Sequence, residues 1–171
     1  RFGHVEAGLR TLDKRRPFPE EMNRRLADAA TDAYFAPTER ARQALLREGF
    51  ADAAIHVTGN TIVDALLEIS RRPFDWNGSA LRAIPQNERM ALITAHRRES
   101  FGEPFRELCH AIRELAGRFT EIEFIYPVHL NPNVRRPVGD ILSGLKNVHL
   151  IEPLDYSALV HLMKRSTLIL T

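Results

Sequence analysis

Short apolar runs alternate with stretches of helical periodicity along this chain, and no internal repeat interrupts the alternation. This pattern predicts a parallel β-sheet covered by helices, so we expect an α/β fold. The expected strands cover residues 33–36, 54–57, 90–94, 122–126, 148–151 and 168–171. Amphipathic helices are expected between them.

The first predicted helix begins at Pro19, which suits the first position of a helix. Glu20 therefore falls at the N-terminus of this helix, and the helix is expected to end near Thr31. Its buried apolar stripe is expected to consist of Met22, Leu26, Ala29 and Ala30.

The chain has the organisation of two units within a longer protein. Residues 71–88 lack periodicity and contain turn-forming residues, which is typical of a linker. The sequence opens without Met inside an apparent strand and closes on another at 168–171. We therefore expect a piece of a larger α/β protein.

Composition and charge exclude several classes of protein. No apolar run approaches the roughly 20 residues that cross a bilayer, and no signal peptide is present. A net charge of +2 is too small to indicate nucleic-acid binding. Cys109 is the only cysteine, which favours a reducing compartment, the cytoplasm. Glu107 and His110 have a spacing that suits a metal, but no second such pair exists, so we expect no metal site.

Two carboxylates fourteen positions apart, Glu6 and Glu20, point to acid/base chemistry on a bound ligand. Glu6 follows an apparently buried strand, where a carboxylate is costly unless it has a partner. A cost of this kind usually marks a site. Turn and cap roles are expected for four other acids, Asp13, Glu21, Asp28 and Asp155.

Polar clusters follow the carboxyl ends of the predicted strands, where open α/β sheets bind ligands. His4, His96 and His129 follow strand cores and are expected at a common edge, whereas the other histidines are expected to be structural. Arg97 and Arg98 open a helix, where cationic donors and free N–H groups suit a pyrophosphate, and a solvated charged turn is an equal alternative. A Walker-type phosphate loop and a Gly-x-Gly-x-x-Gly motif are both lacking, so nothing indicates a nucleoside-triphosphatase or a dinucleotide enzyme.

Five spaced motifs resemble those of the bacterial non-hydrolysing UDP-N-acetylglucosamine 2-epimerases. They are HVEAGLRT at residues 4–11, PEEMNR at 19–24, TGNT at 58–61, HRRESFG at 96–102 and YPVHLNP at 126–132. The resemblance runs from end to end. Hydrolysing relatives lack a segment like residues 96–99, which favours the non-hydrolysing branch.

The resemblance implies a GT-B architecture, in which a nucleotide sugar binds between two Rossmann-like parallel-sheet domains. Residues 1–59 would form the C-terminal part of the first domain, and residues 60–171 would form most of the second, UDP-binding domain. The hinge would lie near Gly59. A third acidic residue of the family would precede Arg1, and its ribose-binding segment would follow Thr171. The isolated chain is therefore expected to hold half a site, to be inactive and to self-associate.

The resemblance also implies the chemistry. The family inverts C2 of the sugar by eliminating UDP to give 2-acetamidoglucal and then adding UDP back to the other face, without a cofactor. By motif match, Glu6 and Glu20 are the candidate acid/base residues, and which of them abstracts the C2 proton stays open. His96 is the candidate partner of the UDP phosphates.

Further positions match ligand contacts of the family. Arg97 and Arg98 would bind substrate, and Arg97 together with His129 would hold a second UDP-N-acetylglucosamine as an activator. Leu154 and Leu159 match positions beside the uracil, where Leu154 would act through its main chain. Related enzymes often carry Phe at position 159 and usually Asn at position 100, so this sequence departs from the family pattern at both positions. The resemblance implies a homodimer in cell-surface polysaccharide biosynthesis.

Two alternatives stay open at this point. A GT-B glycosyltransferase would share the fold and the UDP-sugar, but an acceptor site does not explain the pairing of Glu6 with Glu20. A non-catalytic fragment for sugar-nucleotide binding or dimerisation is the other alternative. Hydrogen exchange at C2 without an acceptor separates the first alternative from the epimerase, and titration with UDP tests the second.

Overall fold

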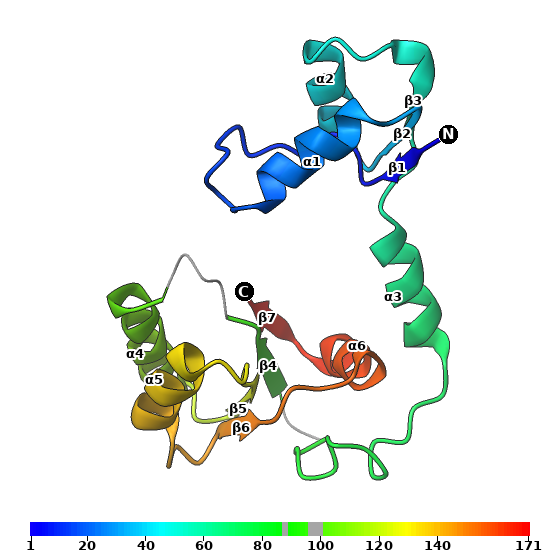
Figure 1. Ribbon diagram of the computed structural model, residues 1–171. Coiled ribbons are helices and arrows are strands. Elements are labelled where there is room, and N and C mark those ends of the chain that lie inside the picture. The colour runs from blue at the N-terminus through cyan, green and yellow to red at the C-terminus, as the bar shows by residue number, and fades with distance from the viewer. Residues whose placement is uncertain (87–88, 96–100) are drawn as a thin grey trace. The chain divides into compact units, whose positions relative to one another are not determined.

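The computed structural model describes residues 1–86, 89–95 and 101–171 (Figure 1). The chain divides into two compact units, Arg1–Leu67 and Glu68–Thr171. Each unit has its own parallel sheet with helices, which confirms the predicted α/β class. The assignment of domains with a boundary at Gly59 stays a prediction. Within the described residues, no helix has both the length and the apolar character that a membrane span requires.

The first unit is built on a three-stranded parallel sheet in the order β1-β2-β3. Its strands are β1 (Gly3–Val5), β2 (Ala33–Ala36) and β3 (Ile55–Val57). Its helices are α1 (Glu20–Ala29), α2 (Glu39–Arg47) and the first part of α3 (Thr61–Arg71), and the short 3-10 helix Asp52–Ala54 precedes β3. Strand β3 therefore begins one residue later than predicted. The division between the units falls within α3, which has no buried residue.

Helix α2 lies very close to the turn that follows β1. Thr38 caps the helix, because its Oγ1 accepts a hydrogen bond from the Ala41 N–H at 3.2 Å. The buried face of α2, with Leu45, packs on the core of the first sheet. Gly8 has a φ of 80°, and a Cβ at this position would lie 2.3 Å from the carbonyl oxygen of Ala41. The turn can approach the helix this closely only because residue 8 is glycine.

We expect Gly8→Ala to destabilise the protein by at least about 2 kcal/mol, because it adds both backbone strain and a clash with Ala41. Gly49→Ala is the matched control, since Gly49 has a φ of 90° but no atom within 4 Å of its added Cβ. The free energy of unfolding of this control should fall by only about 1 kcal/mol, the cost of placing a residue with a Cβ in the left-handed conformation. Urea denaturation measures both losses, and equal losses in the two variants would contradict the close approach.

Helix α1 begins at Glu20, one residue after the predicted start at Pro19, and it buries a polar face. Its buried residues are Glu21 and Asp28, both 0% exposed, whereas Met22 is 40% and Leu26 is 64% exposed. Ala29 and Ala30 are also exposed. The predicted apolar stripe is therefore wrong, because the two buried carboxylates have hydrogen-bond partners in the segment before the helix.

The second unit is built on a four-stranded parallel sheet in the order β6-β5-β4-β7. Its strands are β4 (Arg89–Ile93), β5 (Ile122–Pro127), β6 (Val148–Ile151) and β7 (Leu168–Leu170). Its helices are α4 (Glu103–Arg118), α5 (Pro132–Leu142) and α6 (Tyr156–Arg165). Figure 1 shows α4 and α5 on one face of this sheet and α6 on the other. A parallel sheet covered on both faces explains the continuous apolar runs of its strands.

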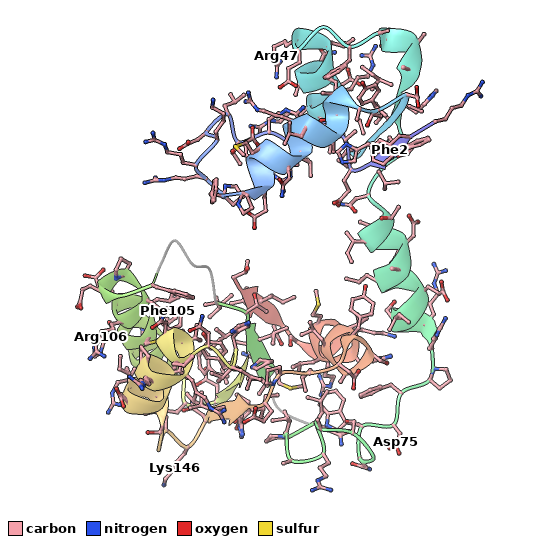
Figure 2. All side chains as sticks on the ribbon, viewed as in Figure 1. Phe2, Arg47, Asp75, Phe105, Arg106 and Lys146 are labelled. Carbon is pink, nitrogen blue, oxygen red and sulfur yellow. The ribbon has the colours of Figure 1, made fainter. Side chains whose placement is uncertain are left out.

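The two faces of this sheet carry separate cores. Ala91 and Ile93 pack with α4 and α5, and the alternate residues Met90 and Leu92 pack with α6. The α4 side includes Phe105, which is labelled in Figure 2. Cys109 also lies in this core, where burial raises the pKa of its thiol to about 11. The thiol therefore stays protonated at neutral pH and serves as a small apolar side chain.

Residues 72–86 contain no helix or strand, as the lack of periodicity predicted, yet they are not a linker. Leu81 is 0% and Ile84 is 3% exposed, and both belong to the core beneath α6. Phe74 and Trp76 pack against the same core. The linker interpretation is wrong because irregular backbone can bury well-spaced apolar side chains without helical or strand periodicity.

Candidate functional site

The two candidate acid/base residues lie in the first unit. Glu6 directly follows β1 with a φ of 65°, and its side chain is exposed. The expectation that Glu6 ends a buried strand is therefore wrong, because β1 itself is largely exposed in the described structure. Glu20 is exposed at the first position of α1. Both carboxylates are thus accessible to a ligand, and we call residues 6–12 the Glu6 loop.

Asp28 lies at the centre of a buried polar network beside the Glu6 loop. Its Oδ1 lies 2.5 Å from Nδ1 of His4 on β1, and its Oδ2 accepts a hydrogen bond from the Arg10 guanidinium at 2.6 Å. The Asp28 carbonyl oxygen accepts a hydrogen bond from the Tyr34 hydroxyl at 2.9 Å. The predicted turn or cap role of Asp28 is wrong, since this carboxylate joins α1 to the strand and the loop.

Arg10 extends this network to helix α2. Its guanidinium donates two hydrogen bonds to Glu48, from Nε at 2.8 Å and from an Nη at 2.7 Å, and its side chain is only 3% exposed. The hydrogen bond with Glu48 is the main cause that raises the pKa of Arg10, and the same bond lowers the pKa of Glu48. Both groups therefore stay charged, and the pair links the Glu6 loop firmly to the end of α2.

Glu21 holds the C-terminal end of the Glu6 loop. Its carboxylate accepts hydrogen bonds from the backbone N–H groups of Thr11 at 3.0 Å and Leu12 at 3.3 Å. Arg25 donates a third, from Nε at 3.2 Å. Burial opposes the charge on Glu21, but these hydrogen bonds outweigh it and hold the pKa of the carboxyl below its ordinary value of 4.5. The predicted turn or cap role of Glu21 is therefore wrong, because its carboxylate joins the backbone of Thr11 and Leu12 in the Glu6 loop to Arg25 on α1.

The lowered pKa of Glu21 predicts a pH-dependent contribution to stability. A carboxyl whose pKa is lower in the folded than in the unfolded state stabilises the fold above its unfolded pKa, near 4.5 here. This contribution is lost as the pH falls through the folded pKa. We therefore expect Glu21→Gln to be less stable than the unsubstituted protein at pH 7, with a difference that shrinks below pH ~4.5. Thermal unfolding across pH measures the difference, and a pH-independent difference would contradict the assignment.

The structure also bears on the other two acids that were assigned to turns and caps. The Asp13 carboxylate accepts a hydrogen bond from the Arg15 N–H at 2.9 Å, which is a turn contact. Asp155 is the N-cap of α6 and accepts a hydrogen bond from the Ala158 N–H at 2.8 Å. Both predictions are confirmed.

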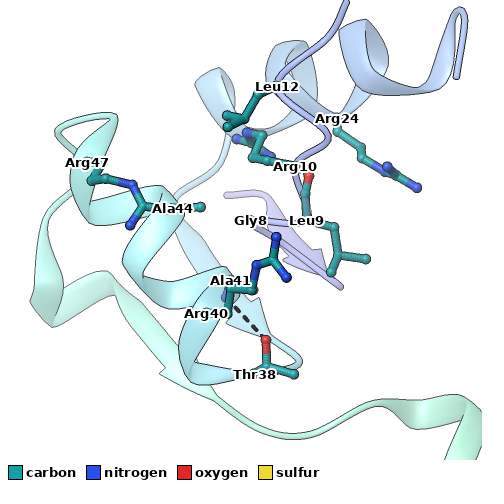
Figure 3. Close-up of a pocket in the computed structure, with 10 residues that line it drawn as sticks. All are labelled: Gly8, Leu9, Arg10, Leu12, Arg24, Thr38, Arg40, Ala41, Ala44 and Arg47. Atoms are coloured by element: carbon teal, nitrogen blue, oxygen red, sulfur yellow. Dashed lines mark hydrogen bonds between the residues drawn. The ribbon is translucent and has the colours of Figure 1, made fainter. Parts of the chain in front are cut away.

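A groove of about 360 Å³ lies beside the Glu6 loop, between it and helices α1 and α2 (Figure 3). Its charged lining consists of Arg10, Arg24, Arg40 and Arg47. Arg10 is engaged by Asp28 and Glu48, whereas the other three form no ion pair with any residue that the structure describes. Guanidinium groups bind phosphates and carboxylates with paired hydrogen bonds, so this groove suits an anionic ligand.

The second unit carries the remaining candidates. His129 is exposed before α5, where its Nδ1 accepts a hydrogen bond from the Asn131 N–H at 3.1 Å. Leu154 and Leu159 are partly buried and pack against the core beneath α6. His96, Arg97 and Arg98 lie outside the described residues. The ligand roles of all these positions stay predictions.

Tyr126 fixes the chain just before residue 96. Its hydroxyl donates a hydrogen bond to the carbonyl oxygen of Ala95 at 2.5 Å, which joins β5 to the segment after β4. Burial raises the pKa of Tyr126, so the hydroxyl keeps its proton and its donor role. Ala95 is thus anchored at the carboxyl end of the sheet.

The histidines differ in their surroundings. His4 lies within β1 rather than after it, and it contacts Asp28. His149 on β6, expected to be structural, lies 2.5 Å from the Glu123 carboxylate on β5, a cross-strand pair. Glu107 and His110 are exposed on α4. In the residues that the structure describes, no group of three His, Cys, Asp or Glu side chains is arranged to hold a metal ion.

Sequence reasoning missed the network that holds the Glu6 loop. The sequence pattern indicates Arg10 only as part of a motif and predicts local turn or cap roles for Glu21 and Asp28. One signal was present: Glu21, Arg25 and Asp28 have i, i+4, i+7 spacing and so share one face of α1. A stripe of charged residues along a helix can be a solvated face. When a motif that contains an arginine precedes the helix, the same stripe is equally consistent with a buried ionic contact.

Comparison with known proteins identifies the family. A family model described as UDP-N-acetylglucosamine 2-epimerase matches residues 1–171, the whole chain. The chain belongs to the UDP-N-acetylglucosamine 2-epimerase family. The family explains why the five motifs occur together along a single chain.

Individual relatives agree with this assignment. A UDP-N-acetylglucosamine 2-epimerase of Escherichia coli strain K12 is 50% identical over 175 residues, which cover 99% of this chain and 46% of that protein. A probable UDP-N-acetylglucosamine 2-epimerase of Ralstonia solanacearum is 48% identical over 177 residues, which cover 99% of this chain and 47% of that protein. This chain therefore spans about half the length of these curated relatives.

A solved structure shows the same fold. The crystal structure of the UDP-GlcNAc 2-epimerase from Neisseria meningitidis, bound to UDP-GlcNAc, matches with a TM-score of 0.86 and 42% identity. The match covers 98% of this chain and 46% of that one. This likeness confirms the predicted GT-B-type α/β fold with Rossmann-like parallel sheets.

Proposed function

We propose that the complete protein that carries this sequence interconverts UDP-N-acetylglucosamine and UDP-N-acetylmannosamine. The observation that carries the proposal is the match of the whole chain to the epimerase family, together with accessible Glu6 and Glu20 in two of the matching motifs. The Neisseria meningitidis relative has been solved with UDP-GlcNAc bound, which supports a UDP-sugar as the ligand. The proposed branch is the non-hydrolysing one.

The proposed reaction eliminates UDP across C1 and C2 to give 2-acetamidoglucal and then adds UDP back to the opposite face. The C2 proton is weakly acidic, so a positioned base must remove it, and a second acid must return a proton to the other face. Glu6 and Glu20 are the proposed acid/base pair. Cations must stabilise the departing pyrophosphate, and the proposed partner of the UDP phosphates is His96.

The other proposed ligand contacts come from the second unit. Arg97 and Arg98 are proposed to bind the substrate, with Leu154 and Leu159 beside the uracil. Arg97 and His129 are proposed to hold a second UDP-N-acetylglucosamine as an activator. The exposed position of His129 before α5 supports access of a ligand to this histidine.

The activity is assigned to the complete protein, and we propose that these 171 residues alone are inactive. The named epimerases that they match are about twice as long, since the matches cover 46% and 47% of those proteins. The complete enzyme is proposed to be a cytoplasmic homodimer that works without a cofactor in cell-surface polysaccharide biosynthesis.

The direct test follows the sugar by proton NMR after the complete protein is mixed with UDP-N-acetylglucosamine alone. We expect UDP-N-acetylmannosamine to appear and to reach equilibrium with the substrate. A second reaction with EDTA and without NAD should proceed equally well. Release of UDP with free sugar would instead indicate a hydrolase, and turnover that requires an acceptor would indicate a glycosyltransferase.

A further inference from the structure

The Glu6 loop contains backbone strain at both of its ends. Glu6 has a φ of 65° and Leu12 a φ of 67°, which is the left-handed region that residues other than glycine rarely adopt. Such conformations persist only where the surrounding structure holds them. The strain at Glu6 is notable because this residue is one of the two candidate acid/base residues.

Asp28 holds the N-terminal side of the loop. Each of its two carboxylate oxygens has a different partner, His4 just before the loop and Arg10 within it. Asp28 is fully buried, so displacing His4 would leave one carboxylate oxygen without a partner, and displacing Arg10 would leave the charge without its cation in a low-dielectric environment. The position of Glu6 between these two partners is therefore strongly restrained.

Glu21 holds the other side of the loop in the same way. Its carboxylate, also fully buried, accepts hydrogen bonds from two successive backbone N–H groups, those of Thr11 and Leu12. Hydrogen bonds from backbone groups fix the path of the main chain itself. The strained conformation of Leu12 lies directly at this contact.

Both holding carboxylates belong to the helix that begins with the other candidate acid/base residue. Glu21 and Asp28 are seven residues apart on α1, which places them on one face about two turns apart. Glu20 directly precedes Glu21. The loop that begins with Glu6 is thus joined at two points to the helix that begins with Glu20.

Stability alone explains these buried charges poorly. Buried ion pairs can often be replaced by packed apolar residues with no loss of stability, because desolvation offsets their attraction. Helix α1 already has apolar residues in Met22 and Leu26, and both are exposed. The helix buries two carboxylates whose partners include groups of the Glu6 loop, which favours a role in fixing geometry.

We propose that Glu21 and Asp28 are positioning residues that hold the Glu6 loop against helix α1 and thereby set the spacing of Glu6 and Glu20 for the reaction. This inference rests on the proposed function. A catalytic group displaced by about 1 Å can lose on the order of 10²-fold in rate. The two carboxylates therefore act on turnover through geometry, without contact with the substrate.

The test uses the complete protein with Glu21→Gln and Asp28→Asn, assayed at a temperature where circular dichroism shows each variant fully folded. We expect kcat to fall by roughly 10- to 100-fold while KM changes by less than about 3-fold. Amide hydrogen exchange at Thr11 and Leu12 should accelerate in Glu21→Gln. Asp52→Asn is the matched control, because Asp52 pairs with Arg42 in the same unit but is 63% exposed, and its kcat should be unchanged.

Arg10→Lys keeps the positive charge and is the second variant for the case that Asp28→Asn does not fold. It should show the same fall in kcat without a matching rise in KM. Normal kcat in the folded variants of an active protein would overturn this inference and leave the carboxylates with a purely stabilising role. An unsubstituted protein without epimerase activity would overturn the proposed function instead.

Discussion

Glu6→Gln and Glu20→Gln in the complete protein are each expected to lower kcat by roughly 10²- to 10⁴-fold, the usual contribution of a general acid or base. Each substitution keeps the size of the side chain but removes its ability to take up and release a proton. KM should change little, because the lost interaction belongs to the transition state. Both side chains are exposed, so their substitution should not unfold the protein.

Glu39→Gln is the matched control for this pair. Glu39 is also an exposed first-turn glutamate, at the start of α2, and it contacts Arg42 and Gln43. Its substitution should leave kcat unchanged. Near-normal turnover of either the Glu6 or the Glu20 variant would contradict a catalytic role for that carboxylate. It would then be a solvated acid at the end of a strand or a charge at the start of a helix.

His96→Ala is expected to lower kcat/KM by roughly 10²- to 10³-fold, with changes in both kcat and KM. As the proposed partner of the UDP phosphates, His96 would stabilise the bound substrate. It would also stabilise the transition state, in which negative charge develops on the departing pyrophosphate. Inhibition by added UDP should weaken in parallel, because product binding uses the same contact. His110→Ala on the exposed surface of α4 is the control. A variant at position 96 with unchanged affinity for UDP would contradict the assignment.

The layered fold could be predicted because local sequence patterns decide it. Met90 and Leu92 alternate with Ala91 and Ile93 between the two faces of the second sheet, and such a strand has to be covered on both sides. Helix starts could also be predicted, because the cap of α2 needs only Thr38 and the N–H three residues later.

The buried face of α1 could not be predicted from local pattern. Periodicity selects apolar residues such as Leu26, but whether a helix buries a carboxylate depends on partners elsewhere in the chain. Asp28 meets Arg10, which lies 18 positions earlier, and Arg10 meets Glu48, 38 positions later. Contacts over such separations leave no periodic signal, so the same limit applies to Glu21 and to the network that holds the Glu6 loop.

The candidate site residues could be selected from the sequence for a different reason. Glu6 and Glu20 were selected by residue type and by the motifs that surround them, and neither criterion requires burial. The stated reason for Glu6, a costly buried position, was wrong, whereas its place directly after a strand was correct. The candidate roles of Glu6 and Glu20 therefore rest on the motif resemblance and stay predictions.

The most direct test of the central claim is the epimerisation of UDP-N-acetylglucosamine in D₂O by the complete protein, with mass spectrometry of the product. Elimination followed by re-addition requires that the C2 proton leaves and that a solvent hydrogen replaces it. We predict UDP-N-acetylmannosamine that carries one deuterium, at C2. Product that fully retains its original C2 hydrogen would contradict the proposed mechanism and the acid/base roles of Glu6 and Glu20.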